Sequence, residues 1–173
     1  MLGDHGLLEK RAFYDGSARV PLLVRVPWLS EAQTKIAGSV GQIDLVPTLL
    51  DLIGEQIPDH LQGESKAGVL RGESTLDDND VFVQWNGRGD RDLGTPTINE
   101  MIALPRRTIV SGDRWKLNLC DGDDGELFNL NDDPHELTNL FNDPAQSERV
   151  RSMTARLRAW QKQTGDTAPL PAG

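Results

Sequence analysis

Polar and ionisable side chains are clustered in the first nineteen residues, directly before an apolar stretch rich in β-branched residues. The apolar stretch covers residues 20–26, and the cluster consists of Asp4, His5, Glu9, Lys10, Tyr14, Asp15 and Arg19. This order is typical of the edge of an α/β active site, where polar groups stand on loops beside a buried strand. The cluster begins almost at residue 1, so no strand or helix precedes it to hold it in place. We therefore expect the chain to be the C-terminal part of a larger enzyme.

The composition restricts the classes of partner. Acidic residues outnumber basic ones by 27 to 18, which gives a formal net charge of −9 and leaves no basic stripe to neutralise phosphates. The single cysteine, Cys120, allows no internal disulfide bond. No apolar stretch reaches the length of a membrane span, and Met1 is not followed by a signal-peptide pattern. We expect neither nucleic acid nor a membrane as partner. The compartment stays open, with the periplasm, the extracellular space and the cytoplasm all compatible with the sequence.

The patterning predicts a boundary near residue 78. Before it, residues 21–27 are expected to form a strand, and residues 44–54 a helix with Asp44 as its N-cap and Gly54 as its end. One face of this helix is apolar, with Ile43, Val46, Leu49, Leu50 and Ile53. Residues 55–79 are expected to form a long surface connection.

After the boundary, short β-rich segments alternate with turn residues. They predict a strand at 81–85 and, further on, an antiparallel meander with strands at 107–111, 115–120 and 126–130. Residues 86–100 are expected to form a loop, and residues 133–136 a single helical turn. A terminal helix is expected over about 144–163, with Val150, Met153, Leu157 and Trp160 on its apolar face. The fold class is therefore α/β.

Three blocks of the chain resemble type I sulfatases. Residues 2–27 (LGDHGLLEKRAFYDGSARVPLLVRVP) are similar to a Gly-Asp/Glu-His-Gly motif followed by the active-site lysine and a Tyr-Glu/Asp-x-x-x-Arg-x-Pro segment. QIDLVPTLLDLIG with IPDHLQGES is similar to a downstream helix and the loop after it. WKLNLCDGDDGELFNLNDDPHELTNLFNDP is similar to the C-terminal hairpin and the Asp-Pro-x-Glu-x-x-Asn-Leu segment. The blocks keep the family's order, which is far more specific than one short motif.

The resemblance implies a partial alkaline-phosphatase-like sandwich. Residues 1–78 would be the C-terminal part of the sulfatase catalytic domain, with the last strand and helix of the large domain. Residues 79–173 would be a small antiparallel-sheet subdomain with a terminal helix. A large domain that is only partly present would expose apolar surface, so self-association is expected.

The resemblance assigns the catalytic role to Lys10, the lysine that contacts the sulfate ester. An ammonium group has three donors and a full positive charge, which suits it to stabilise charge on a transferring group. Asp4 and His5 match the second of two tandem motifs in the family, whereas the metal ligands belong to the first. They are therefore expected to shape the pocket or contact substrate, and no metal ligand is expected in this chain. A structural role for His5 is an equal alternative.

Other candidates lie at the rim of the expected cleft. Tyr14 and Arg19 follow Lys10 in the same block, and Arg19 is expected to pair with Asp15 and fix the segment that presents Lys10. Trp85 ends a strand and is a candidate for substrate contact. Arg107 is a candidate for binding an anionic substituent.

The function implied by the resemblance is hydrolysis of sulfate monoesters. It requires a calcium ion and a formylglycine made within a Cys/Ser-x-Pro-x-Arg motif, and neither that motif nor the paired aspartates of the metal site occur here. Cys120 is followed by Asp-Gly-Asp-Asp, so it does not match the modified residue. The chain alone is expected to be inactive. The alternatives are a phosphonate or phosphate ester hydrolase of the same superfamily and a non-catalytic interaction module. The sequence leaves open whether the substrate is an aryl, choline or carbohydrate sulfate.

Overall fold

The computed structural model describes residues 3–6, 12–87, 96–101, 103–122 and 125–171. Contacts divide the chain into two compact units. The first contains residues 1–20, 82–110 and 114–173, and the second contains residues 21–81 and 111–113. This division differs from the expected boundary at residue 78, because the N-terminal segment groups with the C-terminal sheet. The physical reason is a set of buried contacts to that sheet, described below.

The first unit is built on a four-stranded sheet in the order β1-β2-β3-β4. The strands are β1 (Val81–Trp85), β2 (Arg106–Val110), β3 (Trp115–Cys120) and β4 (Glu126–Asn129). The pairs β2–β3 and β3–β4 are antiparallel, with Thr108 opposite Asn118 and Leu117 opposite Leu127. The expected strands and their meander order are confirmed.

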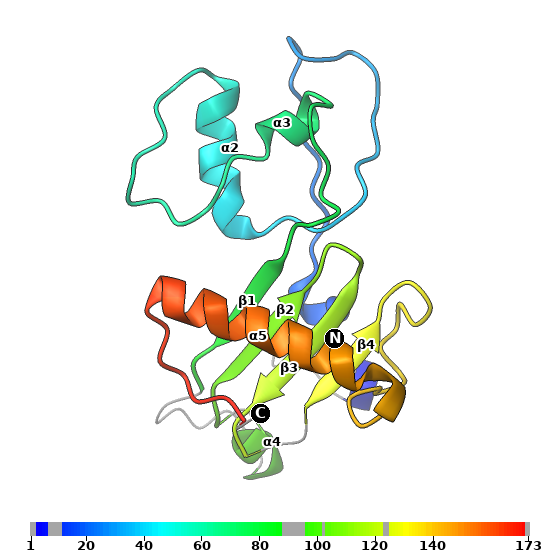
Figure 1. Ribbon diagram of the computed structural model, residues 1–173. Coiled ribbons are helices and arrows are strands. Elements are labelled where there is room, and N and C mark those ends of the chain that lie inside the picture. Colours follow the sequence, from blue (N-terminus) through cyan, green and yellow to red (C-terminus); the bar gives the residue numbers. More distant parts are fainter. Residues whose placement is uncertain (1–2, 7–11, 88–95, 102, 123–124, 172–173) are drawn as a thin grey trace. The chain divides into compact units, whose positions relative to one another are not determined.

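One helix, α5 (Ser147–Thr164), crosses a face of this sheet after the short 3-10 turn η3 (Pro144–Gln146) (Figure 1). The Asp143 carboxylate accepts a hydrogen bond from the Ala145 amide at 2.9 Å, and Gly165 ends the helix with a φ of +70°. Met153 and Leu157 are fully buried in the core with Ile109, Leu117 and Leu127. The expected terminal helix and its apolar face are therefore confirmed.

Strand β3 is buried on both of its faces. Leu117 and Leu119 belong to the core beneath α5, whereas Lys116 and Asn118 alternate with them and point to the opposite face. Lys116 and Asn118 are nevertheless only 1% and 5% exposed. The opposite face of the sheet must therefore be covered as well, and part of the N-terminal segment covers it.

The second unit contains α2 (Leu45–Leu52), preceded by η2 (Gln42–Asp44), and the short α3 (Ala67–Leu70). The expected helix is confirmed, and the chain leaves it at Gly54, whose φ is +77°. Asp44 occupies the expected N-cap position, but its carboxylate accepts a hydrogen bond from the Glu64 amide at 2.9 Å and caps no amide of its own helix. Most of the apolar face is exposed, since the buried residues of α2 are Pro47, Thr48 and Leu52.

Four further expectations differ from the structure. Residues 21–27 form no strand, because a strand needs a neighbouring strand for its backbone groups and none of the strands in the described residues lies beside them. The surface connection 55–79 contains α3, and the expected loop 86–100 contains the start of α4 (Pro96–Met101). Residues 133–136 form a hydrogen-bonded turn and no helix, because Glu136 has a φ of +56°.

Candidate functional site

The Gly-Asp-His-Gly sequence forms a tight turn. Asp4–Gly6 is a 3-10 turn in which the Gly6 amide donates to the Gly3 carbonyl at 3.0 Å. Gly3, His5 and Gly6 have φ values of +113°, +53° and +69°. Glycine adopts such angles at little cost, which explains why the motif places glycine on both sides of the Asp-His pair. Asp4 and His5 are both exposed on this turn.

The His5 ring is stacked on Tyr14. The two ring centroids lie 3.7 Å apart and the planes differ by 5°. The Tyr14 hydroxyl donates a hydrogen bond to the Glu126 carboxylate at 2.6 Å. Burial and this negatively charged acceptor raise the pKa of Tyr14 above its ordinary value. The stack therefore rests on β4 through a phenol that stays protonated.

A buried ion cluster surrounds Lys116. Its Nζ atom donates to the Phe13 carbonyl at 3.0 Å, to Asp15 Oδ1 at 2.5 Å and to Glu136 Oε1 at 2.7 Å. The Asp15 amide donates in turn to Glu136 Oε2 at 2.5 Å. All three donors of the ammonium group are used, which is the condition under which a buried charge is tolerated. These contacts attach residues 13–15 to the sheet.

Arg19 pairs with Asp15 as expected, with Arg19 Nη1 3.4 Å from Asp15 Oδ2. The Arg19 side chain is 64% exposed, so the pair contributes little to stability. Arg19 directly follows α1 (Asp15–Ala18) and is nevertheless a second basic partner of Asp15, beside Lys116.

Arg107 is enclosed by acceptors. Its guanidinium donates to both oxygens of Asp166, to Asn86 Oδ1 and to the backbone carbonyls of Trp85 and Arg106, at 2.6–2.9 Å. All five N–H donors are therefore used within the chain, and none is left for an external anion. The Arg107 hydrogen bonds lower the pKa of Asp166 to about 2. This geometry favours a structural role for Arg107 over contact with substrate. The Trp85 backbone carbonyl is one of the acceptors that hold the Arg107 guanidinium.

The structure thus collects the sequence candidates into two groups within the first unit. His5, Tyr14 and Arg19 lie at or beside residues 13–15, and Trp85 lies with Arg107. Lys10 lies outside the described residues. Within the described ranges, no three histidine, cysteine, aspartate or glutamate side chains are close enough together to bind a metal ion.

Sequence reasoning missed Lys116, Glu126 and Glu136. Their signal was present, because period-two alternation in WKLNLC puts Lys116 and Asn118 on one face and leucines on the other. The alternation does not show whether the polar face is buried, and only the contact with residues 13–15 reveals this.

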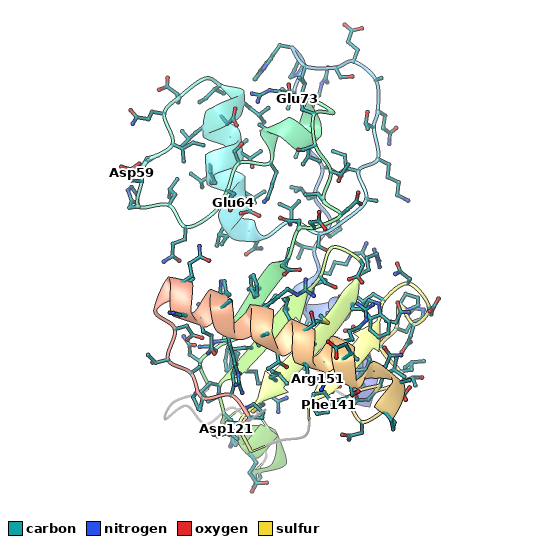
Figure 2. The ribbon with its side chains drawn as sticks, viewed as in Figure 1. Asp59, Glu64, Glu73, Asp121, Phe141 and Arg151 are labelled. Carbon is teal, nitrogen blue, oxygen red and sulfur yellow. The ribbon has the colours of Figure 1, made fainter. Side chains whose placement is uncertain are left out.

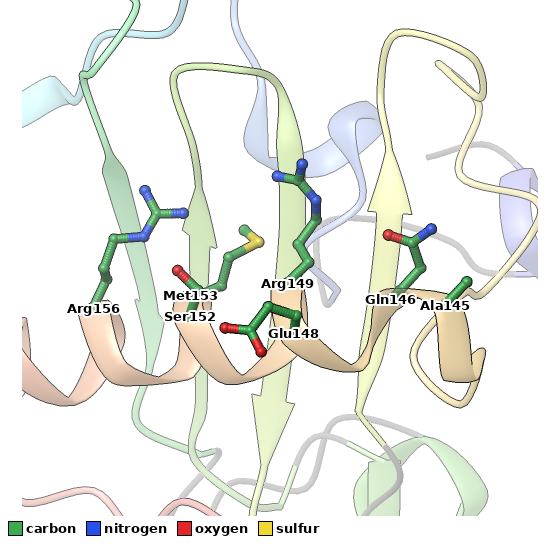
Figure 3. A pocket seen from close by; sticks show the side chains of 7 residues that line it. All are labelled: Ala145, Gln146, Glu148, Arg149, Ser152, Met153 and Arg156. Carbon is green, nitrogen blue, oxygen red and sulfur yellow. The ribbon is translucent and has the colours of Figure 1, made fainter.

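A hollow of about 410 Å³ lies along the N-terminal half of α5. Arg149, Met153 and Arg156 lie on the same side of the helix there (Figure 3). The lining is mostly polar and comes from η3 and α5 alone, so it lacks the converging groups of a catalytic site.

Known proteins are similar to this chain in sequence and in fold. Residues 3–163 match the family model described as N-sulphoglucosamine sulphohydrolase, C-terminal. The N-acetylglucosamine-6-sulfatase of Bos taurus is 33% identical over 143 residues, which cover 70% of this chain and 25% of that protein. The N-acetylglucosamine-6-O-sulfatase of Bacteroides thetaiotaomicron is 36% identical over 72 residues, which cover 42% of this chain and 13% of that protein.

Solved structures agree with these matches. A protein described as bound to its substrate D-glucosamine-2-N,6-O-disulfate superposes with a TM-score of 0.80 at 25% identity, covering 98% of this chain and 33% of that one. The phosphonate monoester hydrolase of Silicibacter pomeroyi superposes with a TM-score of 0.73 at 24% identity, covering 94% and 32%. That second likeness concerns the fold alone.

The family match covers most of the chain, and the fold is the corresponding part of an alkaline-phosphatase-like sulfatase fold. The chain belongs to the sulfatases, in the family of N-sulphoglucosamine sulphohydrolase C-terminal regions. It spans 25% of the length of the mammalian relatives that it matches. No helix in the described part of the chain is long and apolar enough to cross a membrane.

Proposed function

We propose that this chain supplies the C-terminal part of the active-site rim of a sulfuric ester hydrolase. The observation that carries the proposal is the family match over residues 3–163, which includes the Gly-Asp-His-Gly turn and the sheet on which it rests. Relatives named for N-acetylglucosamine 6-sulfate, and a structural neighbour described with a disulfated glucosamine, support a sulfated amino sugar as the substrate class.

In this proposal Lys10 contacts the sulfate ester. An ammonium group there would stabilise the negative charge that develops on the sulfate oxygens and on the bridging oxygen as the S–O bond breaks. His5 and Tyr14 would shape the rim beside it, with Asp4 on the same turn. Arg19 would act at a distance, through Asp15.

The nucleophile and the metal are proposed to lie in polypeptide other than this chain. The resemblance implies a formylglycine and a calcium ion, but the described residues offer no cluster of three metal ligands. Cys120 is buried and lacks the sequence context of a formylglycine precursor. The described residues therefore do not fit the calcium ion, and Cys120 does not fit the formylglycine. No catalytic step is assigned to either group in this chain. The chain by itself is expected to show no turnover.

The test compares this chain with the polypeptide encoded by the complete reading frame. Both are assayed with glucosamine 6-sulfate, an aryl sulfate, a phosphate monoester and a phosphonate monoester. The longer polypeptide is expected to hydrolyse sulfate esters, and Lys10→Met is expected to lower kcat by about 100-fold or more. Lys35→Met, at an exposed lysine of the second unit, is the matched control and should leave kcat unchanged.

The alternatives make different predictions in the same assay. Faster turnover of the phosphonate or phosphate ester would favour a phosphonate or phosphate ester hydrolase. The Silicibacter pomeroyi phosphonate monoester hydrolase has the same fold in this region. No turnover of any ester by the longer polypeptide would favour a non-catalytic module. Sulfate ester hydrolysis by the 173-residue chain alone would show that the nucleophile lies within it.

A further inference from the structure

Three segments from two of the motif blocks meet at one buried lysine. Asp15 belongs to the segment after Lys10 and lies 101 residues from Lys116 in sequence, while Glu136 lies 20 residues on, in the Asp-Pro-His-Glu turn. Side-chain exposure is 1% for Lys116, 2% for Glu136 and 20% for Asp15. Burial of this kind requires that the three segments be held in one arrangement.

We propose that Lys116 is a positioning residue for the sulfatase reaction. With Asp15 and Glu136 it forms an ionic clasp that holds residues 13–15 on the sheet, and so places the rim segment formed by Tyr14 and the His5 turn that is stacked on it. The inference rests on the proposed function, because the clasp acts on catalysis only through that segment.

The clasp holds the backbone as well as the side chains. Lys116 Nζ donates to the Phe13 carbonyl, and Glu136 accepts from the Asp15 amide, so Tyr14 is fixed on both of its sides. Lysine suits this place because one compact cation serves two carboxylates and a carbonyl at once. Without it, two carboxylates would face each other in a buried site, which is strongly unfavourable.

A second chain of contacts carries this order to the His5 ring. Thr108 Oγ1 donates to Asn118 Oδ1 at 2.6 Å, and Asn118 Nδ2 donates to Glu126 Oε2 at 2.9 Å. Glu126 then accepts from Tyr14, on which His5 is stacked. The rim turn is thereby connected to three strands of the sheet, and the clasp keeps Tyr14 in reach of Glu126.

The chain offers an internal probe, because Tyr14 is its only tyrosine. The ultraviolet absorbance of tyrosinate therefore reports the ionisation of Tyr14 alone. The charged groups that act on Tyr14 are Glu126 and Glu136, which disfavour its ionisation, and Arg106, which favours it. The 173-residue chain is titrated from neutral to alkaline pH, and circular dichroism follows its folding in parallel.

In the unmodified chain, tyrosinate is expected to form only together with alkaline unfolding. In Lys116→Met, which removes the donor to the Phe13 carbonyl and to Asp15, it is expected to form near the ordinary phenol pKa of about 10, while the sheet stays folded. Lys116→Met/Glu136→Leu, which leaves no two carboxylates facing each other and also removes the acceptor of the Asp15 amide, is expected to give the same result. Lys162→Met, in the exposed last turn of α5, is the matched control and should behave like the unmodified chain.

Two outcomes would overturn the proposal. One is a Tyr14 that resists ionisation equally in the unmodified chain and in Lys116→Met. The other is unfolding of both Lys116→Met and Lys116→Met/Glu136→Leu at neutral pH, which would make the cluster a requirement for folding and not a positioning device. Neither readout needs turnover, so a failure of the proposed function would leave the Tyr14 result intact. In a longer polypeptide that hydrolyses sulfate esters, Lys116→Met should lower kcat about 10- to 100-fold, and an unchanged kcat would also overturn the proposal.

Discussion

Arg107 and Lys116 both carry a positive charge that is almost fully buried, and each is surrounded by as many acceptors as it has donors. Removing a single partner from such a cluster leaves an uncompensated charge, which typically costs about 3–5 kcal/mol. At the scale of the residue, these two cations attach distant segments to the sheet. Arg107 binds the turn after α5 through Asp166, and Lys116 binds the N-terminal segment.

The Arg107–Asp166 pair predicts a dependence of stability on pH. The pKa of Asp166 is lowered from 3.8 to about 2 in the folded chain, so its contribution is complete above pH 4 and is lost as the pH falls towards 2. The Asp166 side chain is only 13% exposed, and the lowered pKa by itself corresponds to a contribution of about 2 kcal/mol. Urea unfolding of the unmodified chain and Asp166→Asn should therefore differ at pH 5 and converge near pH 2.

The control for this prediction is Asp59→Asn, in the loop after α2, where the side chain projects away from the helix (Figure 2). Its unfolding free energy should follow that of the unmodified chain throughout the titration. A difference between the unmodified chain and Asp166→Asn that stays constant from pH 5 to pH 2 would contradict an ionic contribution.

At the scale of the element, the loop after α2 shows why the Leu-Gln-Gly-Glu-Ser segment has its sequence. The loop crosses the N-terminus of the helix, where Asp44 accepts from the Glu64 amide and Thr48 Oγ1 accepts from the Lys66 amide. A Cβ atom on Gly63 would lie 2.0 Å from the Ile43 carbonyl oxygen. Only glycine allows the two backbones to approach so closely.

Gly63→Ala is therefore expected to push the loop from the helix. We expect the free energy of local opening of α2 to fall by about 2 kcal/mol, as for other overpacked sites. Hydrogen–deuterium exchange of residues 42–54 measures this change as faster exchange.

Gly41→Ala provides the comparison, since Gly41 has a φ of −73° and its added Cβ would lie 3.5 Å from the Asp44 carboxylate. Exchange in that variant should stay close to that of the unmodified chain. Equal protection of α2 in Gly63→Ala would show that the loop accommodates the methyl group.

The elements that the sequence predicted correctly are those whose signals are local. The turn η3 that leads into helix α5 is capped by Asp143, and α5 itself has its stop at Gly165 and two buried apolar residues one turn apart, Met153 and Leu157. The expected strand at residues 21–27 had an equally strong apolar signal, but a strand requires hydrogen bonds to another segment. Sequence patterning reports which residues favour a strand and is silent about whether a neighbour is present.

At the scale of the whole molecule, exposed apolar side chains are concentrated in the second unit. Leu23 is 94% exposed, and the other large apolar side chains that stand out from this unit are Leu22, Val24, Trp28, Ile36, Ile43, Val46, Leu49 and Ile53. So much exposed apolar surface is unusual in a monomer. We therefore predict concentration-dependent self-association, measured by sedimentation velocity, and its reduction in the double variant Leu23→Gln/Val46→Gln.

The matched control is Leu137→Gln in the first unit, at a side chain that is 76% exposed. It should leave self-association unchanged, because isolated apolar side chains on a surface are ordinary. If the unmodified chain sediments as a monomer at every concentration, the prediction is refuted.

The sequence by itself determined the sulfatase family, the meander and the terminal helix, because each depends on neighbours in the chain or on an ordered set of motifs. It also predicted the Arg19–Asp15 pair, which spans a single helical turn. Only the tertiary structure decided that Arg107 is saturated, that Lys116 is buried and that residues 13–15 belong to the C-terminal sheet. Those outcomes depend on hydrogen bonds between residues up to 121 positions apart, and the energy of a buried charge is set by partners that no local pattern specifies.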